Sequence, residues 1–228
     1  EIGVRLVGSE MCIRDRFWII LFKTILSKLY HWKIYVVGSV EYQYPNHLFQ
    51  AGYFLDKKYY DENTIDFKHL LLSEKNQSLL KDIQNSNSVG VHIRRGDYMT
   101  KQNLVIFGNI CTQKYYHDAI RIITEKVNDA VFYVFSDDIS WVQTHLDIPN
   151  AVYVNWNTGE SSIYDMYLMS SCKYNIIANS TFSYWAARLN KKTNMVIYPS
   201  KWYNTFTPDI FPESWCGISV SYTHLTLP

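Results

Sequence analysis

The chain has 228 residues, of which 47% are hydrophobic and 16% aromatic, enough to bury a core in one large or two modest domains. Its 22 basic and 21 acidic residues nearly cancel, which argues against a nucleic-acid partner and against attraction to an anionic membrane surface. The four cysteines have neither the paired spacing of a zinc site nor the density of a disulfide framework, so they favour a reduced, cytoplasmic setting.

The two ends of the chain differ from the rest. The stretches "GSEMCIRDR" and "VSYTHLTLP" resemble translated sequencing-adapter sequence, so residues 1–16 and 217–228 are predicted to be non-native. The apolar stretch that follows residue 16 is interrupted by Lys23 and Lys28 and is too short to span a bilayer. The spacing of its apolar residues from Trp18 to Leu29 predicts an amphipathic helix rather than a signal peptide, with at most peripheral membrane contact.

From residue 89 onward, β-branched apolar runs alternate with segments of helical periodicity. The predicted strands are 89–93, 130–135, 151–156, 174–178 and 195–199, and the predicted helices are 112–127, 140–146, 161–172 and 181–190. Such alternation predicts an α/β fold with a parallel sheet covered by helices on both faces. The carboxyl ends of the strands then share one edge, where open α/β sheets bind ligands.

Polar clusters follow three of these predicted strands. They are Arg94-Arg95-Gly96-Asp97, Ser136-Asp137-Asp138 and Asn179-Ser180-Thr181. Arginine suits a diphosphate because its planar fork can hold two phosphate oxygens at once. The helix predicted to begin near Thr181 offers unpaired N–H groups and a positive dipole end to a second phosphate. The sequence therefore predicts a nucleotide-type crevice, with Asp137 or Asp138 placed to accept hydrogen bonds from a base or ribose.

Each cluster also has a purely structural interpretation. The arginines could pair with Asp97 or Asp138 in a charged network, and Ser136 could cap the helix that follows it. Ser180 or Thr181 could likewise be an ordinary helix cap, and Asn179 heads a glycosylation sequon that matters only in a secreted chain. His92 alternates with buried residues, so it could be an interior histidine or a catalytic one.

Four segments together resemble the bacterial α-1,2-fucosyltransferase family. They are "HIRRGDY" (92–98), "FSDDISWV" (135–142), "DMYLMSSCKYNIIANSTFSYWAARLN" (165–190) and "YPSKWY" (198–203). The resemblance extends from about Tyr53 to about Trp215. It implies a GT-B fold in which two Rossmann-like domains face a cleft. Residues 17–86 would then be the remnant of a truncated, acceptor-side N-terminal domain, and residues 87–216 the domain that binds GDP-fucose.

The resemblance also assigns roles to residues. Arg94 and Arg95 match the arginine pair that neutralises the departing GDP, and Asp137 and Asp138 fall in the region that faces guanine or ribose. Ser136, Asn179, Ser180, Thr181 and Phe182 complete the expected donor site. Asp97 is the first candidate for the general base and His92 the second, although Asp97 could instead orient Arg94.

The implied reaction is inverting transfer of L-fucose from GDP-fucose to the 2-hydroxyl of a galactoside in an oligosaccharide or lipid-linked glycan. The arginines would replace a metal, so no cofactor is expected. Two alternatives stay open: a nucleotide-sugar transferase with another donor, and a noncatalytic nucleotide- or glycan-binding fragment. The chain lacks a glycine-rich GGLGNQ-like segment, and Phe107 lies where relatives usually have a histidine, so acceptor binding by residues 101–112 does not follow from the resemblance.

Overall fold

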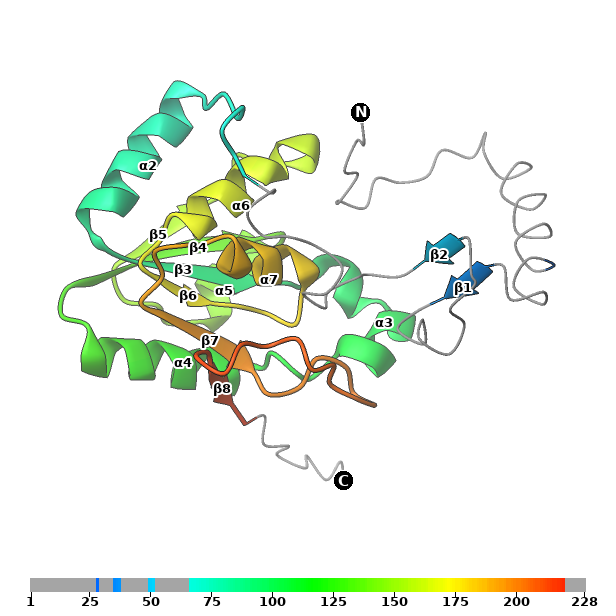
Figure 1. Cartoon of the computed structure of the whole chain (residues 1–228). Coiled ribbons are helices and arrows are strands. Elements are labelled where there is room, and N and C mark those ends of the chain that lie inside the picture. The colour runs from blue at the N-terminus through cyan, green and yellow to red at the C-terminus, as the bar shows by residue number, and fades with distance from the viewer. Residues whose placement is uncertain (1–27, 29–34, 38–48, 52–65, 220–228) are drawn as a thin grey trace. The chain divides into compact units, whose positions relative to one another are not determined.

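The computed structural model describes residues 28, 35–37, 49–51 and 66–219, and the chain divides into two compact units, residues 1–60 and 61–228 (Figure 1). In the first unit, strands β1 (Tyr35–Val37) and β2 (Phe49–Ala51) pair in parallel. Apart from Lys28, the helix predicted from Trp18 to Leu29 lies outside the described residues, as do residues 1–16 and 220–228 of the predicted non-native ends.

The second unit contains a six-stranded, fully parallel sheet in the order β5-β4-β3-β6-β7-β8. From β3 the chain adds β4 and β5 on one side, then returns to add β6, β7 and β8 on the other. This is the strand order of a doubly wound, Rossmann-type sheet, whose switch point lies between β3 and β6. The predicted α/β fold with a parallel sheet is therefore confirmed. The strands are β3 (Asn87–Ile93), β4 (Ala130–Ser136), β5 (Ala151–Val154), β6 (Tyr174–Ile176), β7 (Met195–Pro199) and β8 (Cys216–Ile218).

Helices cover both faces of this sheet (Figure 1). Alternate residues of β3 face opposite sides, so Val89 and Val91 join the core under α4 and α5, while Gly90 faces α6. A Cβ atom on Gly90 would lie 3.0 Å from Cγ of Met169, so glycine is what allows α6 to pack this closely. One face carries α2 (Glu74–Asn85), α6 (Ser162–Ser170) and α7 (Thr181–Arg188), and the other α4 (Gln113–Lys126) and α5 (Ile139–His145).

Within the second unit, the sequence did not predict α2, α3 (Lys101–Phe107), β8 or two short 3-10 helices, Gly96–Met99 and Gly159–Ser161. Helix α2 packs Leu79 and Ile83 into the same core as α6 and α7, so it belongs to the sheet-containing unit rather than to a separate N-terminal part. Strand β8 pairs with β7 as far as Ile218, two residues beyond the predicted domain end at 216.

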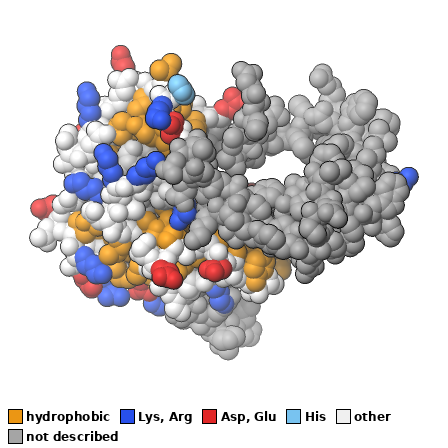
Figure 2. All heavy atoms as spheres, viewed as in Figure 1, with side chains coloured by type: hydrophobic (Ala, Val, Ile, Leu, Met, Phe, Trp, Pro, Cys, Tyr) orange, Lys and Arg blue, Asp and Glu red, His pale blue; other side chains and the backbone are white. Residues whose placement is uncertain are grey.

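Two observations on the described residues bear on contact with membranes and nucleic acids. Within the described part of the chain, no helix is both long enough and apolar enough to cross a bilayer. Figure 2 shows lysine and arginine side chains scattered over the visible face rather than gathered into one basic patch. Any anion site on this face must therefore be made by a few local side chains.

Candidate active site

The carboxyl ends of β3, β4 and β6 lie next to one another in the sheet. Ile93, the last residue of β3, is in register with Ser136, the last residue of β4, and β6 pairs with β3 on its other side. The three predicted polar clusters follow these three strands, so the topology brings all of them to one edge. The ends of β3 and β6 also flank the switch point, where doubly wound sheets bind their ligands.

Arg94 makes two ion pairs, one within the first polar cluster and one to the second. Its Nη2 lies 2.7 Å from Oδ1 of Asp97, and its Nη1 lies 2.9 Å from Oδ2 of Asp137. A Cβ atom on Gly96 would approach that same Asp137 oxygen to 2.5 Å, so a glycine leaves room for the carboxylate. One third of the Arg94 side chain remains exposed, which leaves part of the guanidinium accessible to a ligand.

Arg95 is less exposed than Arg94 and also contacts an aromatic ring. Its backbone N–H donates to Oδ1 of Asp137 at 2.9 Å, and its Nε donates to Oδ2 of Asp138 at 3.2 Å. The guanidinium carbon lies 3.7 Å from the centroid of the Trp141 ring, and Trp141 in turn stacks on His145. These contacts use Nε and one face of the guanidinium, so the group is oriented before any ligand arrives.

Asp137 and Asp138, which lie at the predicted donor site, also make contacts within the protein. Asp138 is the N-cap of α5, because its Oδ1 accepts a hydrogen bond from the Trp141 N–H at 3.1 Å. The predicted cap, Ser136, instead accepts from the Asp138 N–H through its hydroxyl. Both aspartates also pair with the arginines, so the charged network foreseen as an alternative is present. Contacts of these carboxylates with guanine or ribose stay a prediction.

His92 lies in the interior of the unit. Its side chain is 6% exposed, its ring centroid lies 5.0 Å from that of Phe182, and its Nδ1 has no hydrogen-bond partner among the described residues. Burial, and secondarily the positive charge of Arg94, lower the pKa of His92 from 6.5 to about 3. The imidazole is therefore neutral at physiological pH. Its ring packs β3 against the start of α7.

Asn179 ties together three segments that follow different strands. Its Nδ2 donates to the carbonyl oxygen of Trp202 at 3.1 Å and to that of Phe107 at 3.4 Å. Its Oδ1 accepts from the Cys111 thiol, and its own carbonyl accepts from the Tyr98 hydroxyl at 2.9 Å. The residue is 2% exposed, so in the folded chain its side chain is inaccessible to a glycosylating enzyme. Asn179 bridges the switch point rather than presenting its amide to solvent.

The residues after Asn179 open helix α7. Ser180 occupies the N-cap position and is 6% exposed, but its hydroxyl accepts no capping hydrogen bond. The hydroxyl of Ser183 instead accepts from the Ala178 N–H and bonds the Ser180 carbonyl, which shapes this turn. A side-chain cap by Ser180 is therefore wrong. Thr181 and Phe182 are half-buried in the first turn, at the positive end of the helix dipole.

Two site residues were missed by the sequence analysis, Trp141 and Tyr98. Trp141 follows the capping residue by three positions, so it lies in the first turn of α5, close to the arginine that follows the neighbouring strand. An aromatic residue three positions after an acidic cap is the signal that could have identified it. Tyr98 could not have been found this way, because its partner Asn179 is distant in the sequence.

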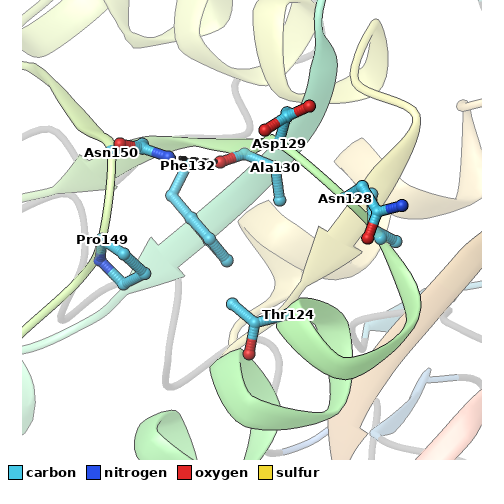
Figure 3. Close-up of a pocket in the computed structure, with 8 residues that line it drawn as sticks. Thr124, Asn128, Asp129, Ala130, Phe132, Pro149 and Asn150 are labelled. Carbon is cyan, nitrogen blue, oxygen red and sulfur yellow. Dashed lines mark hydrogen bonds between the residues drawn. The ribbon is translucent and has the colours of Figure 1, made fainter.

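A separate pocket of about 450 Å³ lies at the opposite, amino edge of the sheet (Figure 3). It is lined by Thr124, Val127, Asn128, Asp129, Ala130, Phe132, Pro149 and Asn150. None of these is a lysine, an arginine or a histidine, so the pocket has no side chain to neutralise a phosphate. Within the described residues, no three His, Cys, Asp or Glu side chains are grouped so as to hold a metal ion.

Known proteins resemble this chain over most of its length. An α-1,2-colitosyltransferase from Escherichia coli is 34% identical over 92% of the chain and 77% of its own length. A galactoside α-(1,2)-fucosyltransferase 2 from Pongo pygmaeus is 27% identical over 69% of the chain and 50% of its own length. Among solved structures, the fucosyltransferase NodZ from Bradyrhizobium matches 56% of the chain and 44% of its own, with 16% identity and a TM-score of 0.39.

The sequence model described as Glycosyl transferase family 11 matches residues 14–219, nearly the whole chain. That range includes the entire six-stranded sheet, the arginine pair and the start of α7. The predicted resemblance to a family of fucosyl-type transferases is therefore confirmed, and the chain belongs to Glycosyl transferase family 11.

Proposed function

We propose that the chain transfers L-fucose from GDP-fucose to the 2-hydroxyl of a galactoside, with inversion at the anomeric carbon. The observation that carries this proposal is the arginine pair at the switch point of a Rossmann-type sheet, in a member of this family. The names of the two relatives, one an α-1,2-colitosyltransferase and one a galactoside α-(1,2)-fucosyltransferase, support the linkage and the acceptor. The chain spans only about half of the latter relative.

In the proposed reaction, the acceptor 2-hydroxyl attacks the anomeric carbon as the bond from that carbon to the β-phosphate oxygen breaks. The hydroxyl proton passes to a general base, and the bonding electron pair leaves on GDP. Negative charge therefore grows on the diphosphate, where Arg94 and Arg95 would stabilise it. Removing one such preorganised donor typically costs about a hundred- to thousand-fold in rate.

The contacts of the arginines with aspartates are compatible with this role. Each guanidinium carries five N–H donors, and the ion pairs to Asp97, Asp137 and Asp138 use only some of them. The aspartates orient the two forks in the absence of a donor and balance their charge. A diphosphate would then bind to the remaining donors, assisted by the N–H groups that open α7.

Asp97 suits the general base better than His92 does. Asp97 is 55% exposed and lies 2.7 Å from Arg94, beside the proposed diphosphate position. His92 is buried, and its pKa of about 3 makes it a poor proton acceptor at neutral pH. Asp97 is thus proposed to take the proton from the acceptor hydroxyl.

The relationship to the colitosyltransferase favours one further candidate, transfer of a different deoxy sugar from its nucleotide donor. The arginine pair would serve either donor, because it contacts the diphosphate and not the sugar. A noncatalytic fragment that only binds nucleotide or glycan is the third possibility, since the chain spans part of its relatives.

Product analysis tests these proposals. The full chain is incubated with a β-galactoside and either GDP-fucose, a GDP-linked dideoxyhexose or UDP-galactose, in the presence of excess EDTA. We expect an α-1,2-linked product from a GDP-linked deoxy sugar, undiminished by EDTA because the arginines supply the positive charge. Equal transfer from UDP-galactose would contradict the proposal that the donor is a GDP-linked sugar. Loss of activity with EDTA that manganese restores would contradict the metal-free mechanism. Binding of GDP without any transfer would favour the noncatalytic fragment.

A further inference from the structure

A row of four aromatic rings begins beside the arginine pair. The guanidinium carbon of Arg94 lies 5.7 Å from the ring centroid of Tyr98, and Tyr98 stacks on Phe107 at 4.5 Å with an interplanar angle of 14°. Phe107 contacts Tyr203 at 5.4 Å, and Tyr203 contacts Phe206 at 4.6 Å. We call these four residues the aromatic row. It connects the segment after β3, the end of α3 and the segment after β7.

Polar contacts fix the backbone beneath the aromatic row. The buried Asn179 bonds the Tyr98 hydroxyl and the Phe107 carbonyl, as described above. Asn204 donates from its backbone N–H to the Ile106 carbonyl at 2.9 Å and from Nδ2 to the Val105 carbonyl at 2.9 Å. These contacts hold the loop after β7 against α3, so the rings keep their places without a ligand.

The far end of the row is exposed and apolar. Phe206 is 59% exposed, and the neighbouring α3 presents Val105 and Ile106 at 73% and 44% exposure. Met99, next to the first ring of the row, is 47% exposed. Exposed apolar surface gathered beside a charged site, on an ordered scaffold, is typical of a surface that binds a ligand.

The chemistry of the row fits sugar rings. A galactose ring has one face of C–H groups that packs on an aromatic ring, and its hydroxyls stay hydrated at the rim. The row starts at Arg94, where the donor diphosphate is proposed to leave, and the acceptor must lie next to that point. The row reaches from Arg94 to the exposed ring of Phe206, and Val105 and Ile106 add exposed apolar surface near that far end. A row of this kind suits an oligosaccharide rather than one isolated galactose.

We infer that the aromatic row binds the sugars of the acceptor glycan beyond the galactose that receives the transferred sugar. This inference rests on the proposed function. It makes the residues between β3 and α4, together with the loop after β7, an extended acceptor subsite. Phe206, as the exposed terminal ring, stacks on the sugar farthest from the reacting hydroxyl.

Acceptor length provides the test. Phe206→Ala removes an exposed ring and leaves the turn in which the Tyr203 N–H donates to the Phe206 carbonyl, so the fold survives. Initial rates of transfer from a fixed donor are measured with a galactose glycoside and with a tri- or tetrasaccharide that ends in galactose. We expect about a three- to tenfold rise in KM for the oligosaccharide, the size of one lost ring contact, and no change for the galactose glycoside. Leu71→Ala, which also removes an exposed apolar side chain, is the control and should change neither KM.

Two further measurements separate the possible failures. GDP affinity by calorimetry should be equal in wild type and Phe206→Ala; if the wild-type chain binds no GDP, the proposed function fails. Saturation-transfer NMR with the oligosaccharide alone then still reports on the row, because it requires no catalysis. An unchanged oligosaccharide KM in Phe206→Ala would overturn the inference. So would a change in sedimentation that accompanies the KM shift, because the row would then be an interface between two copies of the chain.

Discussion

The amino ends and the carboxyl ends of the strands form two opposite edges of the six-stranded sheet, and these edges differ in charge. At the amino edge, the pocket of about 450 Å³ is bordered by the turn residues Asp129 and Asn150, whose φ angles of 51° and 49° are left-handed. Asn150 bonds the Ala130 carbonyl through its Nδ2, which closes this turn. At the carboxyl edge, Arg94 and Arg95 meet carboxylates from two strands. The pocket at the amino edge therefore lacks cations, and the carboxyl edge, which carries them, is the better anion site.

The residues at the two edges also differ in what they contribute to stability and to function. The turn residues at the amino edge are Asp and Asn, which tolerate left-handed backbone and connect helices to strands. The ion pairs at the carboxyl edge are partly exposed, with Arg94 34% and Asp97 55% exposed, and such pairs contribute only about 0–1 kcal/mol to stability. The arginines are thus expected to be dispensable for folding but not for binding a diphosphate.

The largest effect is expected from the arginine pair. Arg94→Ala or Arg95→Ala should lower turnover about a hundred- to thousand-fold, because the charge on the leaving diphosphate is then unmatched. Lysine at either position should also lower turnover strongly, since it keeps the charge but loses the planar fork. The measurement is turnover and melting temperature on the same protein samples.

Arg121→Lys is the matched control for the arginine variants. Arg121 is an exposed arginine on α4 that also pairs with acidic neighbours, Asp118 and Glu125, away from the carboxyl edge. It should leave both turnover and melting temperature unchanged. If Arg94→Lys and Arg95→Lys melt early yet keep near-normal turnover per folded molecule, the pair is structural and the diphosphate role is wrong.

The sequence could predict the sheet and its ligand edge because both depend on local patterns. Buried runs such as the one ending at Ile93 mark strands, and the polar residues that follow must then lie at strand ends. Even the pairing of the arginines with Asp97 and Asp138 could be foreseen as an alternative, since charged neighbours have few other partners at that edge.

The remaining parts of the site depend on contacts between residues distant in sequence. The bonds of Asn179 to Phe107 and Trp202 exist only once the segments after β3 and β7 have folded toward β6. The cap of α5 by Asp138 rather than Ser136 depends on the local backbone, which the residue types do not distinguish. Burial of His92 follows from packing against Phe182. The alternation of residues around His92 leaves an interior histidine as one interpretation, but no sequence pattern distinguishes the other choices.

An intermediate effect on turnover is expected from Asn179, a buried residue at the carboxyl edge. Asn179→Ala removes two donated hydrogen bonds and leaves buried carbonyls unpaired, so we expect about 1–3 kcal/mol of destabilisation. Because the variant also releases loops that carry Phe107 and Trp202 at the carboxyl edge, the KM for acceptor should rise and turnover should fall by about tenfold or more. The measurements are chemical denaturation and steady-state kinetics below the unfolding transition.

Asn190 supplies the matched control at the other edge. It is also buried, and its Nδ2 donates to the Cys172 carbonyl and to Oδ1 of Asn175. Asn190→Ala should lose a similar amount of stability, for the same reason, but keep normal kinetics per folded molecule. Equal kinetic loss in both variants would mean that general loosening of the fold, and not the position of the loops, explains the effect of Asn179.

The smallest effect on catalysis is expected from Asp165, at the β5 end of the carboxyl edge. Asp165 lies in the first turn of α6 and accepts from Nδ2 of Asn157 at 2.6 Å. Burial raises the pKa of Asp165 from 3.8 to about 7, and the hydrogen bond from Asn157 opposes this only in part. The folded state therefore binds more protons than the unfolded state between about pH 4 and pH 7. The stability that Asp165 contributes is present at low pH and is lost as pH rises through this window.

Asp165→Asn tests this sign, because it keeps the acceptor oxygen for Asn157 and cannot ionise. The melting temperature of wild type minus that of the variant should fall by a few degrees between about pH 4 and pH 8, and then level off. His92 acts in the opposite direction, since its lowered pKa makes stability rise with pH up to about 6.5, but it is present in both proteins and cancels in the difference. A difference that does not change with pH would show that Asp165 is ionised throughout this range, and one that grows as pH rises would show that folding lowers its pKa.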